Sequence, residues 1–123
     1  KTVLLPVSGA FHSPLLAESG REFADFLSDF QLRDAAFPVL MNTTGRPARL
    51  AQEIRDNLCR QLTSPVRWTD IMSAAVELGC RTFWEVGPGN VLSGLARRID
   101  RTLVVLPAGR KSEIAALSRA GGE

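Results

Sequence analysis

Apolar positions along the chain alternate between short β-branched runs and stripes with helical spacing. The runs that predict strands are bounded by turn residues and cover 2–8, 37–42, 81–86 and 102–106. The stripes predict helices over 14–30, 48–62, 68–78, 90–99 and 111–118. Because strands and helices alternate, we expect an α/β fold with parallel strands flanked by helices.

Local signals indicate where these elements begin and end. Ser13 followed by Pro14 is typical of an N-cap and the first helical position. The helix over 48–62 is expected to stop before Pro65, because the residue before a proline avoids the α region. Gly79 is expected to end the next helix, and Asn90 to cap the one after it.

The chain has one histidine, His12, at the predicted junction between the first strand and the first helix. An imidazole ordinarily titrates near neutrality, which suits a general base. A base also needs a fixed tautomer, which an acceptor on its other ring nitrogen provides. The alternative is a histidine that only caps the helix or fills a gap, and the residues alone leave both interpretations open.

Two further stretches could bind a ligand or partner, but each also has a purely structural interpretation. The glycine-rich turn in 85–91 joins a strand to a helix N-terminus and could cradle a phosphate, but it lacks both the G-x-G-x-x-G spacing and the P-loop lysine. The alternative is a tight turn. A basic C-terminal region could attract an acidic partner or a cofactor phosphate, or simply form a solvated face. Its members are Arg97, Arg98, Arg101, Arg110 and Lys111.

Composition narrows the function classes. The 123 residues suffice for one compact domain or one lobe, and the net charge of +2 does not favour nucleic acid. No apolar run is long enough to span a bilayer. Cys59 and Cys80 are far apart, which predicts neither a zinc site nor a redox motif and fits the cytoplasm. The G-x-S-x-G elbow of hydrolase-like folds does not occur in the sequence.

Three motifs together resemble one enzyme family. They are LPVSGAFHSPLL (5–16), QLTSPVRWTDIM (61–72) and FWEVGPGNVLSGLARRI (83–99). Their order and spacing are similar to the C-terminal part of malonyl-CoA:acyl carrier protein transacylases and of the acyltransferase domains of fatty-acid and polyketide synthases. The resemblance implies the C-terminal part of an α/β-hydrolase-like acyltransferase core. Residues 1–7 would be the last strand of, or the return from, a ferredoxin-like subdomain, and 8–123 would belong to the large subdomain.

The resemblance implies that a serine takes malonyl from coenzyme A as an ester and passes it to the phosphopantetheine thiol of acyl carrier protein. His12 falls on the family's general base, and Gln61 on the residue whose backbone carbonyl orients it. Phe11 resembles the malonyl-selecting residue before the histidine, and Val91 is expected to line the same cleft. The family usually has histidine where this chain has Gly9.

The family's serine, oxyanion donors and carboxylate-binding arginine match nothing in this sequence. We therefore expect a fragment that opens inside a strand, is inactive alone and needs an N-terminal segment of the same enzyme as partner. The family uses malonyl-CoA and acyl carrier protein and implies no resident cofactor or metal. Two alternatives stay open: the same segment of a polyketide-synthase acyltransferase, and a non-catalytic α/β module that binds nucleotide or phosphate.

Overall fold

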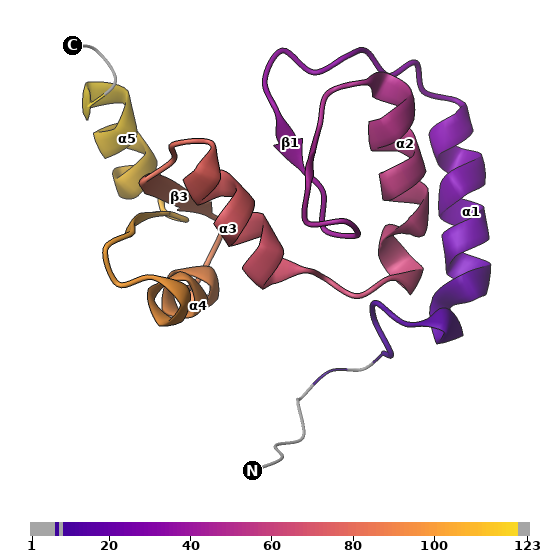
Figure 1. The fold of residues 1–123 in the computed structure, drawn as a ribbon, viewed down its shortest axis with the longest axis horizontal. Coiled ribbons are helices and arrows are strands. Elements are labelled where there is room, and N and C mark those ends of the chain that lie inside the picture. The colour runs from indigo at the N-terminus through magenta and orange to yellow at the C-terminus, as the bar shows by residue number, and fades with distance from the viewer. Residues whose placement is uncertain (1–6, 8, 121–123) are drawn as a thin grey trace. The chain divides into compact units, whose positions relative to one another are not determined.

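The chain divides into one unit that ends at Ala74 and a second that begins at Ala75. The computed structural model describes residue 7 and residues 9–120. Its elements are η1 (Pro14–Leu16), α1 (Ala17–Ser28), β1 (Val39–Leu40), β2 (Pro47–Ala48), α2 (Ala51–Arg60), η2 (Gln61–Thr63), α3 (Trp68–Glu77), β3 (Thr82–Val86), α4 (Val91–Ile99), β4 (Val104–Ala108) and α5 (Lys111–Ala120) (Figure 1). Helices combined with a parallel strand pair confirm the predicted α/β class.

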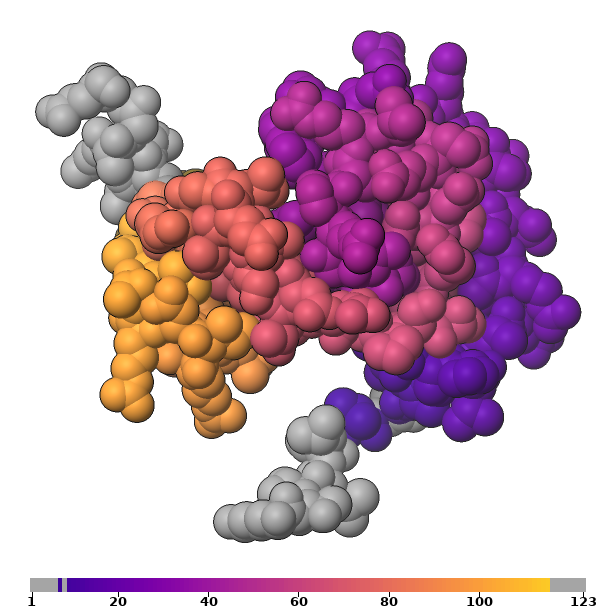
Figure 2. Space-filling view, viewed as in Figure 1, coloured from indigo at the N-terminus to yellow at the C-terminus, as the bar shows by residue number. Residues whose placement is uncertain are grey.

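Helices α1 and α2 lie side by side in the first unit (Figure 1). In the space-filling view the indigo side chains of α1 meet the magenta ones of α2 (Figure 2). The side chain of Arg55 on α2 donates hydrogen bonds to the carbonyls of Leu27 and Phe30, at the C-terminal end of α1. At the other end of α1, a Cβ on Gly20 would lie 3.4 Å from the Thr63 methyl group. The two helices therefore run antiparallel, because the end of α1 meets the first half of α2.

The strand predicted over 37–42 is shorter than expected and its partner is not parallel. Only β1 forms there, and it pairs antiparallel with β2 across a tight turn. Gly45 has a φ of 68° in that turn, and its N–H donates to Met41 O at 2.8 Å. The sequence did not predict this hairpin, because each of its two strands is too short to show a strand period.

The boundaries of α2 and α3 follow the local signals. Ser64 is extended, with φ −110° and ψ 147°, so the α2–η2 segment ends directly before Pro65 as predicted. Helix α3 then ends at Glu77, and Gly79 has a φ of 89°, which suits a C-terminal stop. The apolar face of α3 is buried at Ile71, Met72 and Ala75.

The second unit is built on a parallel pair of strands. Strands β3 and β4 pair from Thr82 opposite Val104 to Val86 opposite Ala108. The last strand therefore begins and ends two residues later than the predicted 102–106. Parallel sheets are normally covered on both faces, yet Val86 is 81% and Val104 is 48% exposed. This small sheet leaves apolar side chains open to solvent.

The predicted stripe on the first helix is only partly buried. Leu27 is buried, whereas Phe26 and Phe30 are 58% and 47% exposed, with ring centroids 4.8 Å apart. The strand predicted over 2–8 falls outside the described residues apart from Val7, and so does nearly all of the proposed segment 1–7.

Candidate active site

The structure brings His12 and Gln61 together, although 49 positions separate them in the sequence. The Nδ1 atom of His12 lies 3.1 Å from the backbone carbonyl oxygen of Gln61. A carbonyl can only accept, so this bond requires the proton on Nδ1 and leaves the lone pair of Nε2 free. His12 is exposed, which leaves that nitrogen accessible to a reacting group.

The backbone at His12 is in an uncommon conformation. Its φ of 60° is the one positive value at a non-glycine position among the residues that the structure describes. Left-handed backbone is uncommon outside glycine and is found at functional sites that the surrounding structure holds in place. Ser13 holds this backbone conformation in place, because its Oγ donates to Ala10 O at 2.7 Å and accepts from Leu15 N at 3.3 Å. Ser13 is also the predicted N-cap.

Replacing Ser13 by alanine removes both bonds that close this turn. We expect Ser13→Ala to lower the free energy of unfolding by about 1 kcal/mol, as for the loss of other helix caps. Ser13→Thr keeps a hydroxyl at the same place and is expected to recover most of that loss. Urea unfolding of the two variants beside the parent measures the difference. Equal unfolding midpoints for Ser13→Ala and the parent would contradict a holding role for the hydroxyl.

The structure places the two proposed specificity residues in different units. Phe11, next to His12, is 60% exposed, and its ring lies over Gly9, where an added Cβ would meet Phe11 Cε2 at 3.3 Å. Gly9 therefore gives this ring room that a larger residue would take. Val91 opens α4 in the second unit and is also exposed.

A buried carboxylate caps α4 in place of the residue expected to do so. Asn90 occupies the N-cap position, but its side chain makes no capping bond, so that prediction is wrong. Glu85 on β3 accepts from the N–H groups of Leu92 and Ser93, each at 2.9 Å, and from the Ser93 hydroxyl. These donors hold the pKa of Glu85 below its ordinary value, the Ser93 hydroxyl having the largest effect. Glu85 thereby joins the end of β3 to the start of α4.

The lowered pKa of Glu85 predicts an acid-sensitive contribution to stability. The ionised form is favoured in the folded protein, so the contribution is present above the unfolded pKa and is lost as the pH falls through the folded one. Glu85→Gln is expected to unfold at lower urea concentration than the parent at pH 7, and the difference is expected to shrink below about pH 4.3. Hydrogen bonds from Thr102 lower the pKa of Asp100 as well. Asp100 is present in both proteins, so its contribution to the pH dependence cancels in the difference. A difference independent of pH would contradict this role.

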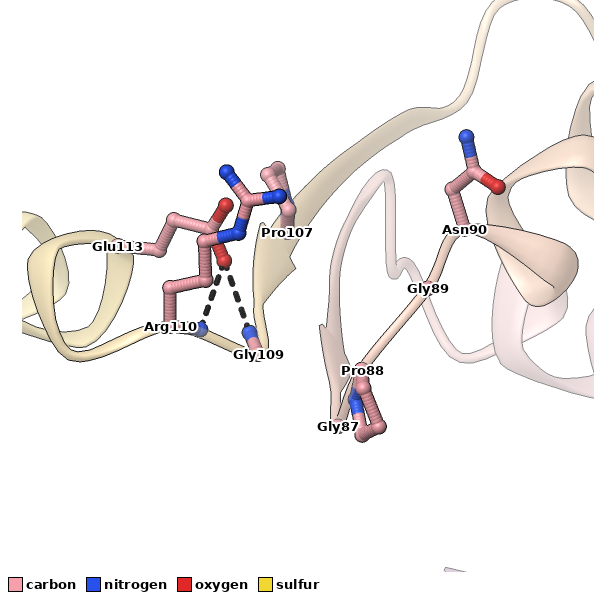
Figure 3. Close-up of a pocket in the computed structure, with 8 residues that line it drawn as sticks. All are labelled: Gly87, Pro88, Gly89, Asn90, Pro107, Gly109, Arg110 and Glu113. Atoms are coloured by element: carbon pink, nitrogen blue, oxygen red, sulfur yellow. Dashed lines mark hydrogen bonds between the residues drawn. The ribbon is translucent and has the colours of Figure 1, made fainter.

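A cavity of about 470 Å³ lies at the carboxyl ends of β3 and β4 (Figure 3). It is lined by Gly87, Pro88, Gly89, Asn90, Pro107, Gly109, Arg110 and Glu113. Glu113 Oε2 accepts from the N–H groups of Gly109 and Arg110, each at 2.9 Å. Carboxylates thus already occupy backbone N–H groups at the starts of both α4 and α5, which leaves fewer donors for a phosphate. The geometry favours a tight turn in 87–90 over a phosphate cradle.

Sequence reasoning missed two side chains that join elements within the units, Arg55 in the first and Glu85 in the second. Glu85 could have been found, because a carboxylate at an inward position of an apolar strand requires buried donors. Arg55 gives no such signal, since its partners are backbone carbonyls 25 and 28 positions away. Within the described part of the chain, no group of three or more histidine, cysteine or acidic residues could hold a metal ion. No helix found there combines the length and the apolar character needed to cross a bilayer.

Known proteins resemble the chain closely. No family model matches it. The polyketide biosynthesis protein ThaF of Burkholderia thailandensis is 45% identical over 97 residues, 79% of this chain and 8% of that protein. The malonyl CoA-acyl carrier protein transacylase of Synechocystis is 41% identical over 98 residues, 80% of this chain and 33% of that protein. The chain therefore spans about a third of that relative.

Solved structures agree with these matches. The malonyl-CoA:ACP transacylase of Synechocystis sp. PCC 6803 superposes with a TM-score of 0.84 at 37% identity, over 91% of this chain and 38% of that one. A malonyl-transacylase solved in complex with a type II polyketide-synthase acyl carrier protein gives 0.82 at 35% identity, over 94% and 38%. The fold is thus shared with transacylases of which this chain matches about 38% of the length.

Proposed function

The chain corresponds to a C-terminal segment of the malonyl-CoA:acyl carrier protein transacylase family, and on this premise we propose that it supplies the general base for malonyl transfer. The bond from His12 Nδ1 to Gln61 O carries the proposal, because it leaves Nε2 as the proton acceptor. The nucleophilic serine comes from a segment outside the 123 residues, since the sequence contains no elbow motif.

Each half of the reaction moves one proton through His12. As the serine oxygen attacks the thioester carbonyl, its proton passes to Nε2; the C–S bond breaks, and Nε2 returns the proton to the leaving coenzyme A thiolate. In the second half the phosphopantetheine thiol gives its proton to Nε2 and attacks the seryl ester. The serine oxygen leaves with that proton. Gln61 O holds Nδ1–H throughout, so the same tautomer is restored after each step.

The exposed apolar side chains of the second unit support the proposal that another segment extends its two-stranded sheet. Parallel sheets bury both faces, and here Trp84, Val86 and Val104 are exposed on a two-stranded pair. We propose that the segment carrying the serine adds strands to this sheet and that residues 1–7 are the last strand of, or the return from, the small ferredoxin-like subdomain. Oxyanion donors and the arginine that binds the malonate carboxylate come from the same segment.

Acyl carrier protein and malonyl-CoA are the proposed partners, with the coenzyme A thioester as substrate and no resident cofactor. The malonyl-transacylase solved with an acyl carrier protein supports the first of these. Phe11 beside His12 is the proposed barrier to an α-methyl group, and Val91 is the proposed second wall. A methyl-sized clash changes selectivity by roughly 10- to 200-fold. We propose the cytoplasm as its location, where two free cysteines such as Cys59 and Cys80 remain reduced.

A second candidate is the same reaction within polyketide synthesis. The 45% identity to ThaF favours it, because this value exceeds the 41% identity to the Synechocystis transacylase. The chemistry at His12 is the same in both cases, and the carrier protein that accepts the malonyl group distinguishes them. Rates with a fatty-acid carrier protein and with a polyketide carrier protein, measured side by side, decide between these two.

The proposed function can be tested by transplantation. The aligned segment of the Synechocystis transacylase is replaced by this chain, and malonyl transfer to acyl carrier protein is assayed. We expect a folded chimera that transfers malonyl. A chimera that unfolds cooperatively but transfers nothing would contradict the proposal, because the relative provides every other catalytic part.

A further inference from the structure

The antiparallel pair of α1 and α2 carries the two halves of the His12 site at one of its ends. His12 precedes η1 and α1, and Gln61 directly follows α2; the two helices lie side by side (Figure 1). Their bond of 3.1 Å closes that end of the pair. The relative position of the two helices therefore sets the distance between Nδ1 and the carbonyl that orients it.

Arg55 fastens the opposite end of the same pair. Its guanidinium extends from α2 and donates through Nη1 to Leu27 O and through Nη2 to Phe30 O. Leu27 lies in the last turn of α1, where its carbonyl also accepts from Phe30 N at 3.2 Å, and Phe30 lies two residues beyond the helix. A cation is also favoured at this end of a helix. Two diverging donors on one rigid plane restrict both sliding and tilting of α1 against α2.

We propose that Arg55 is a positioning residue for His12, acting through the α1–α2 pair; the inference rests on the proposed function. Helix α1 has 12 residues and is about 18 Å long. Over that length, a tilt of about 3° moves the His12 end by about 1 Å, and a misplacement of this size can lower a rate by about 100-fold. Because the hydrogen bonds of Arg55 run to carbonyls of Leu27 and Phe30 and not to His12, we expect its loss to lower kcat and to leave KM nearly unchanged.

Substitution at Arg55 in the Synechocystis chimera tests this role. Arg55→Met keeps most of the stem and removes both donors, so kcat is expected to fall about 10- to 100-fold while KM for malonyl-CoA stays within about threefold. Arg55→Lys can reach only one carbonyl at a time and is expected to give an intermediate kcat. Arg60→Met is the matched control, because the Arg60 Nε donates to Asp56 O within α2 itself, and it is expected to leave kcat within about twofold of the parent.

The outcomes separate this inference from the proposed function. His12→Ala in the same chimera tests the function: if it transfers malonyl like the parent, the function is wrong. If His12→Ala is inactive but Arg55→Met keeps the parent's kcat, only the inference is wrong. An equal loss in Arg60→Met, or a loss that appears wholly in KM, also overturns it. Should Arg55→Met fail to unfold cooperatively, Arg55→Lys decides, and a parental kcat in that variant overturns the inference.

Discussion

His12→Ala is expected to lower kcat for malonyl transfer by about 10²- to 10⁴-fold in the Synechocystis chimera. In the proposed mechanism the imidazole accepts a proton in each half-reaction, and this chain supplies no second histidine. The residual rate comes from substrate binding and from the oxyanion donors of the relative, which the substitution leaves in place. Steady-state rates at saturating malonyl-CoA and acyl carrier protein measure the loss.

Gln61→Ala is the informative comparison for His12→Ala. Alanine keeps the backbone carbonyl that accepts from His12 Nδ1, so a far smaller loss of kcat is expected than for His12→Ala. A loss as large as that of His12→Ala would show that the glutamine side chain, and not the carbonyl, is the group that matters. A His12→Ala chimera with the parent's kcat would contradict the assignment of the base.

Gly109→Ala is expected to destabilise the second unit by about 3 kcal/mol, near the upper range for overpacked sites. A Cβ at this position would lie 2.0 Å from the carbonyl oxygen of Gly87 and 2.7 Å from its carbonyl carbon. Both are backbone atoms of the turn beside the cavity, so the clash can be removed only by a backbone shift and not by a change of rotamer. Urea unfolding measures the loss.

Gly94→Ala provides the matched control for this prediction. Gly94 lies within α4, and a Cβ there would meet nothing within 4 Å. Alanine in an open helical position is expected to stabilise the protein by roughly 0.5–1 kcal/mol, because glycine is the poorer helix former. If Gly109→Ala unfolded at the same urea concentration as Gly94→Ala, the close approach of residues 87 and 109 would be wrong.

The sequence predicted the helices and the parallel pair well because each carries a strong local signal. Ser13, Pro65 and Gly79 mark helix boundaries through their own backbone preferences, and the structure follows all three. The apolar run that forms β3 is recognisable from its own residues, without knowledge of the strand that pairs with it. The pairing of His12 with Gln61 came from the family resemblance, since spacing alone cannot bring together residues 49 positions apart.

The missed features depend on tertiary contacts. Asn90 has the right residue type for a cap, but Glu85 on the preceding strand already binds the N–H groups of Leu92 and Ser93. The antiparallel β1–β2 pair was missed because both of its strands have two residues, too few to show a period. The bonds of Arg55 to α1 follow from helix packing, which no local pattern encodes.

Proton acceptance by His12 is tested most directly through the seryl ester itself. Intact-mass spectrometry of the chimera, quenched within milliseconds of mixing with malonyl-CoA, is expected to show a malonyl adduct on the parent and almost none on His12→Ala. An adduct that forms at the same rate without the imidazole would contradict the account.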